Sequence, residues 1–134
     1  MLVVGGKSPN AVGYLIEPAL LTDVTSKILV GREETFGPLA PLFKFETEDD
    51  VVAQSNDTDF GLAGYLFLNN LRKIWRVANA LEVGMVRVNT GVISVCEAPF
   101  GGIKKSGLGK EGSKYGLAEF QVIKKITLGN LHLG

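Results

Sequence analysis

The strongest constraint on the fold is an alternation of apolar runs and helix signals that begins at Leu39. Leu42–Phe45 predicts a strand, and Leu62–Leu68 and Met85–Val88 predict two more. Between these strands lie two segments whose first residues are typical of helix starts. The order strand, helix, strand, helix, strand predicts an α/β domain with a parallel or mixed sheet.

Capping residues mark the start of both helices. Thr47-Glu48-Asp49-Asp50 is a capping box, and the helix that it starts should run to about Ser55. Asn70 caps the second helix, and Gly84 stands where a glycine commonly ends one. The second helix has an apolar stripe made of Ile74, Val77, Ala78 and Leu81. We expect that stripe to face the core.

Two further apolar segments lie outside the alternation. Tyr14–Leu21 contains Pro18, which lacks the N–H that a ladder needs, so we expect an extended edge or a loop and no central strand. Gln121–Leu128 combines β-branched residues with lysines and predicts an edge strand without a partner in this chain.

Charge and cysteine content exclude several classes of function. Fourteen Lys and Arg balance fourteen Asp and Glu, which argues against a nucleic-acid partner and a membrane-surface partner. One cysteine, Cys96, excludes an internal disulfide, and with the single His132 it cannot complete a zinc shell, so we expect no metal site. No apolar run reaches the roughly 20 residues that span a bilayer, and we see no targeting signal.

The seventeen glycines are about twice the usual share and concentrate between Gly84 and Gly116. Gly107–Gly112 matches the dinucleotide-binding pattern G-x-G-x-x-G. That pattern needs a strand directly before it, a helix after it and an acidic residue about 20 positions further on. The sequence has too few residues after Gly112 for that unit, so these glycines predict tight turns and close backbone contacts.

Cys96 and the acidic residues give no catalytic constellation of their own. No histidine lies near Cys96 to activate it, and Glu97 disfavours its thiolate, so we interpret it as a structural cysteine. The spacing of the aspartates matches no calcium loop, and caps or turns explain them: Asp49, Asp50, Asp57 and Asp59.

Five motifs follow one another along the chain: Glu33-Glu34-Thr35-Phe36-Gly37-Pro38, Asn56-Asp57-Thr58, Phe60-Gly61-Leu62, Val88-Asn89, and Pro99 through Gly107. Their order resembles the C-terminal part of aldehyde dehydrogenases. Asn89–Ser94 and Ser106–Gly116 are most similar to the succinate-semialdehyde dehydrogenases of that family. The resemblance covers nearly the whole chain but only the last portion of the longer family members. It implies a partial catalytic domain over residues 1–120, an oligomerisation strand and tail over 121–134, and no dinucleotide-binding domain.

The resemblance also implies a reaction. In the family a cysteine thiolate attacks the aldehyde, hydride passes to NAD or NADP, and a glutamate activates the water that hydrolyses the thioester. Those groups lie upstream of the matched part, so the resemblance implies that this chain alone is inactive and that Cys96 is not the nucleophile. It further implies oxidation of succinate semialdehyde in GABA catabolism by a homo-oligomer, a tetramer or a dimer.

Four residues match site positions of the family. Glu34 would accept hydrogen bonds from the nicotinamide ribose, and Phe36 would lean on the nicotinamide ring. Ser94 would donate to the distal carboxylate of the substrate beside two arginines from upstream, and Phe100 would line the substrate tunnel. Arg87, a charge within a predicted strand, departs from the family pattern.

Three alternatives stay open. Glu34 could stand on a solvated loop with Phe36 in a core, and Phe100 could pack below the Gly101-Gly102 turn. The whole chain could also be a noncatalytic module that docks onto a complete dehydrogenase by adding its Gln121–Leu128 strand.

Overall fold

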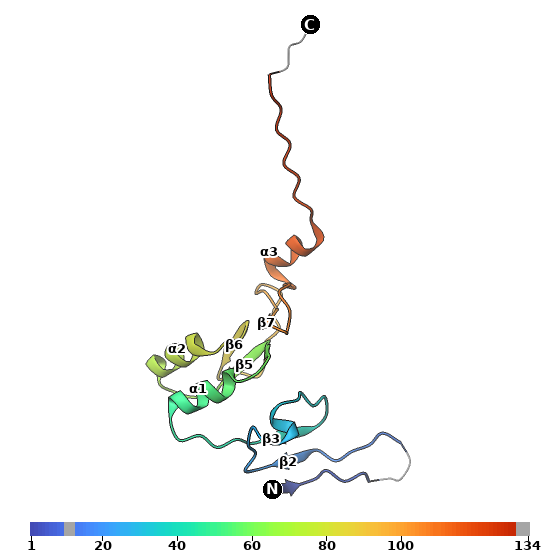
Figure 1. Cartoon of the computed structure of the whole chain (residues 1–134), viewed down its shortest axis with the longest axis vertical. Helices are drawn as coiled ribbons and strands as arrows, with labels where there is room; N and C mark the ends of the chain where they lie inside the picture. Colours follow the sequence, from blue (N-terminus) through green and yellow to red (C-terminus); the bar gives the residue numbers. More distant parts are fainter. Residues whose placement is uncertain (10–12, 131–134) are drawn as a thin grey trace. The chain divides into compact units, whose positions relative to one another are not determined.

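The computed structural model describes residues 1–9 and 13–130, so His132 lies outside the described residues (Figure 1). The chain divides into two units, Met1–Thr58 and Asp59–Gly134. Both mix helices with strands, as the sequence predicts.

The first unit contains a three-stranded sheet in the order β1-β2-β3, formed by Leu2–Val4, Ala19–Leu21 and Leu39–Pro41. β2 pairs antiparallel with β1 and parallel with β3. The prediction that Tyr14–Leu21 is no central strand is therefore wrong. Pro18 lies just before β2, so its missing N–H interrupts no ladder bond, and Ala19 N donates to Pro38 O over 2.8 Å.

The predicted strand Leu42–Phe45 is misplaced by three residues, because the ladder of β3 lies over Leu39–Pro41. Its partner β2 ends at Leu21, and the chain turns at Asp23, which has a φ of 54°. Leu42 N donates to Leu21 O over 2.8 Å and Leu42 O accepts from Val24 N over 3.3 Å, but within the described residues no further strand lies beside the segment to extend the ladder.

The first helix confirms its predicted cap. A short 3-10 turn, η1 (Leu29–Gly31), precedes β3, and α1 spans Glu48–Asn56. Asp50 N donates to Thr47 Oγ1 and Thr47 N donates to Asp50 Oδ2, each over 3.1 Å. This reciprocal pair satisfies two N–H groups that the first turn cannot bond internally.

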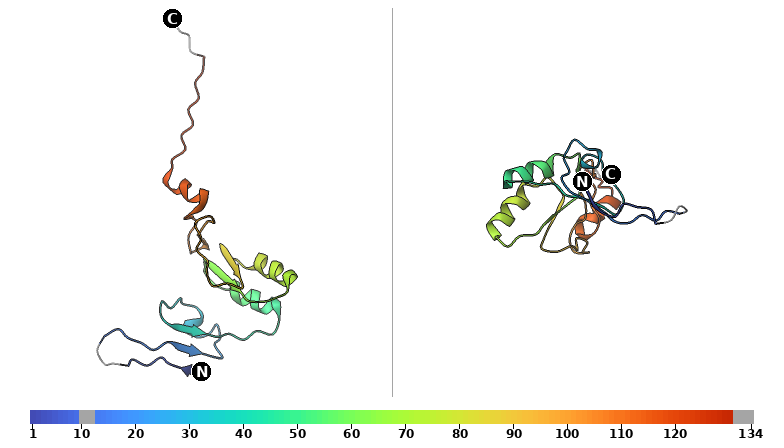
Figure 2. Two further views of the ribbon diagram at one scale, coloured as in Figure 1. Left: turned by 180° about the vertical axis from the view of Figure 1, so that it is seen from behind. Right: turned by 90° about the horizontal axis from the view of Figure 1, so that it is seen from below.

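The second unit is built on two strand pairs. β5 (Ala63–Leu66) pairs parallel with β6 (Met85–Val88), and β4 (Phe60–Gly61) pairs antiparallel with β7 (Ile103–Lys104). The α2 helix, Leu71–Ala80, connects β5 to β6 and runs alongside them (Figures 1 and 2). This strand, helix, strand crossover is the unit that the alternation predicts.

Two features of α2 confirm the sequence reasoning and one corrects it. Asn70 Oδ1 accepts from Lys73 N over 3.0 Å, and the stripe residue Val77 is buried. Gly84, in contrast, does not end the helix, which closes at Leu81. A side chain at Gly84 would come within 2.1 Å of Gly101 O, so close backbone contact requires this glycine.

The chain after β7 forms turns and a short helix. Gly107 and Gly112 have φ values of 96° and 66°, which fits the turns that the glycine pattern predicts. α3 (Ser113–Gly116) and the 3-10 turn η2 (Leu117–Phe120) follow. Residues 121–130 are extended and form no strand ladder with the described part of the chain (Figures 1 and 2).

The core of the described residues is small. Val24 and Val77 are the buried hydrophobic side chains, 6% and 8% exposed. Large apolar side chains are exposed in both units, among them Phe36, Trp75, Phe120 and Ile123. No helix within residues 1–9 and 13–130 is long and apolar enough to cross a bilayer.

Candidate functional site

Ser94 and Phe100 line the same hollow in the second unit. Its volume is about 320 Å³, and its remaining lining comes from Val95, Cys96, Ala98, Glu111 and Gly112. Ser94 is exposed and Phe100 is half-buried. The structure thus brings together the two residues that the sequence analysis assigns to substrate binding, although six positions separate them.

The end of β6 fixes one side of this hollow. Asn89 follows β6 directly, and its side chain bonds both backbone groups of Leu68, accepting from N over 3.0 Å and donating to O over 2.9 Å. Its backbone N also donates to Leu66 O over 2.7 Å. With a φ of 55°, Asn89 turns the chain out of the sheet and starts the loop that contains Ser94.

The other side of the hollow is fixed by backbone pairing. Phe100 and Glu111 exchange two hydrogen bonds of 2.8 and 2.7 Å, and Ser113 N donates to Cys96 O over 2.9 Å. The 94–100 loop is therefore tied at Cys96 and at Phe100 to the segment 111–113. These backbone hydrogen bonds hold this side of the hollow in place although few apolar side chains are buried beneath it.

Cys96 is exposed and free, so it lacks the packing expected of a structural cysteine. The backbone N–H of Glu97 and the Cys96 thiol donate hydrogen bonds that lower the pKa of the Glu97 carboxyl. The Cys96 thiol thus serves as a hydrogen-bond donor to the Glu97 carboxylate.

Glu34 and Phe36 lie in the first unit, on the loop between η1 and β3. Glu34 is exposed, and the ring of Phe36 is 94% exposed. The alternative that places Phe36 in a core is therefore wrong for the described residues. Arg32 Nε donates to Ser26 O over 2.6 Å and Glu33 N donates to Leu29 O over 2.9 Å, which anchors the start of the loop.

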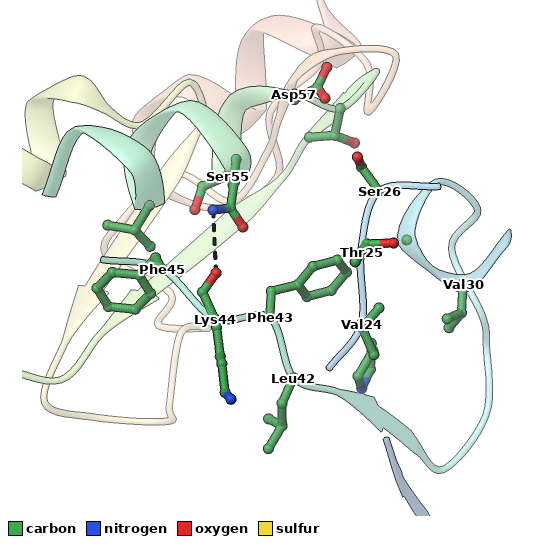
Figure 3. A pocket seen from close by; sticks show the side chains of 15 residues that line it. Val24, Thr25, Ser26, Val30, Leu42, Phe43, Lys44, Phe45, Ser55 and Asp57 are labelled. Carbon is green, nitrogen blue, oxygen red and sulfur yellow. Dashed lines mark hydrogen bonds between the residues drawn. The ribbon is translucent and has the colours of Figure 1, made fainter. Parts of the chain in front are cut away.

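The first unit also contains a cavity of about 780 Å³ that no sequence motif predicts (Figure 3). Its lining comes from residues 24–26, 30–31 and 41–45, and from residues between 51 and 58 in the second half of α1 and just after it. Gln54 Nε2 donates to Lys44 O over 3.4 Å at its edge, and Phe43 and Phe45 supply apolar surface. The cavity includes neither Glu34 nor Phe36, and no motif links its segments. Within the described residues, no group of His, Cys, Asp and Glu could hold a metal ion.

Comparison with known proteins identifies a family and several similar proteins. Residues 1–126 match the model of the aldehyde dehydrogenase family. The NADP(+) succinate-semialdehyde dehydrogenase of Escherichia coli is 53% identical over 96% of this chain and 27% of its own length. The glutarate-semialdehyde dehydrogenase of Pseudomonas aeruginosa is 54% identical over 96% of this chain and 27% of its own length.

Solved structures that resemble this chain belong to the same family. The succinate-semialdehyde dehydrogenase of Burkholderia pseudomallei is 54% identical and superposes with a TM-score of 0.87, over 92% of this chain and 26% of that structure. The chain spans about a quarter of the length of the curated relatives that it matches. It belongs to the aldehyde dehydrogenase family.

Proposed function

We propose that this chain forms the C-terminal part of an NAD- or NADP-dependent dehydrogenase that oxidises succinate semialdehyde to succinate in GABA catabolism. The shared hollow of Ser94 and Phe100 is the observation that best supports this substrate. The names of two similar proteins, a succinate- and a glutarate-semialdehyde dehydrogenase, support an aldehyde with a distal carboxylate.

The lining of the hollow suits such a substrate in chemical terms. The exposed hydroxyl of Ser94 can donate to a carboxylate oxygen, and a hydrogen bond to an ionised acceptor is stronger than one between neutral groups. Phe100, Val95 and Ala98 supply apolar surface for the methylene groups. Glu111 also lines the hollow, so cationic groups from elsewhere in the enzyme would have to balance its charge.

Glu34 and Phe36 would serve the cofactor. NAD or NADP supplies the hydride acceptor when bound, and these two residues would hold its nicotinamide riboside. The exposed carboxylate of Glu34 can accept from ribose hydroxyls, and the exposed ring of Phe36 offers a flat apolar face to the nicotinamide. A similar protein from Saccharomyces cerevisiae is named for NADP(+), and a betaine aldehyde dehydrogenase from Staphylococcus aureus is described in complex with NAD+.

The nucleophile and the general base are not assigned to this chain. Cys96 stands beside the negative Glu97, and the resemblance places both catalytic groups upstream. We therefore expect the purified 134-residue chain to oxidise no aldehyde. NAD-dependent turnover of succinate semialdehyde by this chain would contradict the proposal.

We further propose that residues 1–120 belong to a catalytic domain and that 121–134 are an oligomerisation strand and tail. The support is the exposure of apolar side chains along the tail, among them Val122, Ile123, Ile126 and Leu128. Such a segment suits pairing with a second subunit of a dimer or tetramer. The same exposure also supports the second candidate, a noncatalytic module that adds this strand to a complete dehydrogenase.

A chimaera distinguishes these functions. This chain would replace the matching quarter of the E. coli enzyme, and the product would be assayed with succinate semialdehyde and with butanal, an uncharged aldehyde of the same length. If the proposal is correct, the chimaera is active and Ser94→Ala raises the KM for succinate semialdehyde about tenfold, as expected for a lost hydrogen bond to a charged group. The KM for butanal should change less than about twofold.

Two results would contradict the proposal. An inactive chimaera that is folded and oligomeric would favour the noncatalytic module. Equal effects of Ser94→Ala on the two aldehydes would remove Ser94 from the carboxylate site. Glutarate semialdehyde, one methylene longer, would show in the same assay which chain length the hollow prefers.

A further inference from the structure

Arg87 is a charged residue in the middle of a half-buried strand, which needs a physical explanation. It lies on β6, where it pairs in register with Tyr65 of β5, and it is half-buried. Strand positions of this kind usually hold apolar side chains because burying a charge is costly unless it is hydrogen-bonded. The structure supplies that bond: Arg87 Nη2 donates to Ile93 O over 3.0 Å.

The acceptor of this bond is the last carbonyl before Ser94. The Ile93 carbonyl and the Ser94 N–H belong to one planar peptide group. A bond that holds the carbonyl therefore also fixes the orientation of the peptide plane that leads into Ser94. A guanidinium is suited to this task because it is always charged and its donors form a rigid planar fork. A charge-assisted bond of this type is also stronger than one between neutral groups.

The loop has few other restraints between Asn89 and Val95. Val92 N donates to Thr90 Oγ1 over 3.3 Å, a contact within the loop itself. Across residues 1–9 and 13–130, the structure shows no backbone–backbone hydrogen bond made by residues 90–94. The Arg87 side chain is therefore the tie that connects the middle of this loop to the sheet.

We propose that Arg87 is a positioning residue that sets the Ser94 hydroxyl for the substrate carboxylate by holding the Ile93 carbonyl. This inference rests on the proposed function, since it deepens the role of the same hollow. Arg87 acts through Ser94, so its contribution depends on the serine hydroxyl.

The test is a double-mutant cycle in the active chimaera with Arg87→Met and Ser94→Ala. Arg87→Met keeps the length and apolar stem of the side chain but removes the donor. We expect it to raise the KM for succinate semialdehyde about fivefold and to leave the KM and kcat for butanal within about twofold. In the Ser94→Ala background the same change should alter the KM for succinate semialdehyde by less than about twofold.

Two further variants complete the design. Arg87→Lys keeps one charged donor and should recover part of the lost affinity. Arg72→Met removes an exposed arginine from α2 and should leave both aldehydes unaffected. Hydrogen exchange of the loop amides gives an independent readout, and the amides of residues 92–96 should exchange faster in Arg87→Met than in Arg72→Met.

The outcomes separate the two proposals. If Ser94→Ala leaves the KM for succinate semialdehyde unchanged, the carboxylate site itself is contradicted, and the role of Arg87 falls with it. If Ser94→Ala has its expected effect but Arg87→Met acts equally on both aldehydes, or adds its full effect to Ser94→Ala, the positioning role alone is overturned. A melting temperature equal to that of the parent chimaera would confirm that Arg87→Met is folded.

Discussion

The ion pair between Asp59 and Lys105 predicts a small sensitivity of the second unit to acid. Asp59 precedes β4 and Lys105 follows β7, so the pair joins the two strands at one end of that antiparallel ladder. The hydrogen bond from the Lys105 ammonium and its positive charge lower the pKa of the Asp59 carboxyl below its ordinary value of 3.8. Because the folded pKa is the lower one, the pair stabilises the fold above the unfolded pKa and loses this effect as the pH falls through the folded pKa.

Replacing either partner should therefore reduce the acid sensitivity of the chain. We expect urea midpoints at pH 7 and pH 3 to differ less in Asp59→Asn and in Lys105→Met than in the parent chain, with the same reduction in both variants. The change should be small because both side chains are exposed and solvent screens them. Identical pH dependence in all three proteins would contradict this account.

Glu34 and its neighbour Glu33 offer a matched pair for the cofactor proposal. Both carboxylates are exposed on the same loop, so neither substitution to Gln should change stability by more than about 0.5 kcal/mol. In the active chimaera, Glu34→Gln should raise the KM for the dinucleotide about tenfold, because the amide is a weaker acceptor for ribose hydroxyls. Glu33→Gln should leave it unchanged. If both variants raise the KM for the dinucleotide equally, the loop acts only through its negative charge, and the specific role of Glu34 is contradicted.

At the scale of the elements, Asn89 closes the β5–β6 pair. Its two side-chain bonds to Leu68 join the chain after β5 to the chain after β6. Asn89→Gly would keep the positive φ but lose both bonds, at a cost of about 1–2 kcal/mol in the free energy of unfolding. Asn89→Ala should cost about 1 kcal/mol more, because alanine is also strained at a φ of 55°. Urea unfolding of the chain measures both, and equal stability of the Gly and Ala variants would contradict the backbone part of the argument.

The elements also show what sequence reasoning can and cannot predict. Helix caps depend on residues three positions apart, and so Thr47 and Asn70 are readable from the sequence and confirmed. Strand bounds depend on a distant partner, and so the sequence misses both the central place of β2 and the early end of β3. The role of Gly84 escapes sequence reasoning for the same reason, since the atom that requires a glycine there belongs to Gly101.

The same distinction holds for the site across the whole molecule. Family motifs predict a substrate role for Ser94 and Phe100, and the structure places both on one hollow. Their support depends on the bond between Asn89 and Leu68, which joins the segments after β6 and β5, and on the bond from Arg87 to Ile93 O, and no spacing in the sequence encodes these bonds. Glu34 and Phe36 belong to the other unit, and family motifs alone predict their role.

The apolar residues of the tail, within 121–128, predict how subunits associate. In a strand, Val122, Ile126 and Leu128 share one face, and all are at least 73% exposed in this chain. If residues 121–128 pair with a second subunit, a proline in the middle of the segment removes a ladder donor and weakens the oligomer. We therefore expect Lys125→Pro to raise the dissociation constant of the chimaera about tenfold or more, measured by sedimentation over a range of concentrations.

Lys125→Gln is the control for that experiment, because it removes the same charge but keeps the backbone N–H. It should leave the oligomer mass unchanged at every concentration. If both variants weaken association equally, the lysine charge and not strand pairing holds the subunits. If neither variant does, residues 121–128 are not an oligomerisation strand, and the exposed apolar face of the tail must be covered in another way.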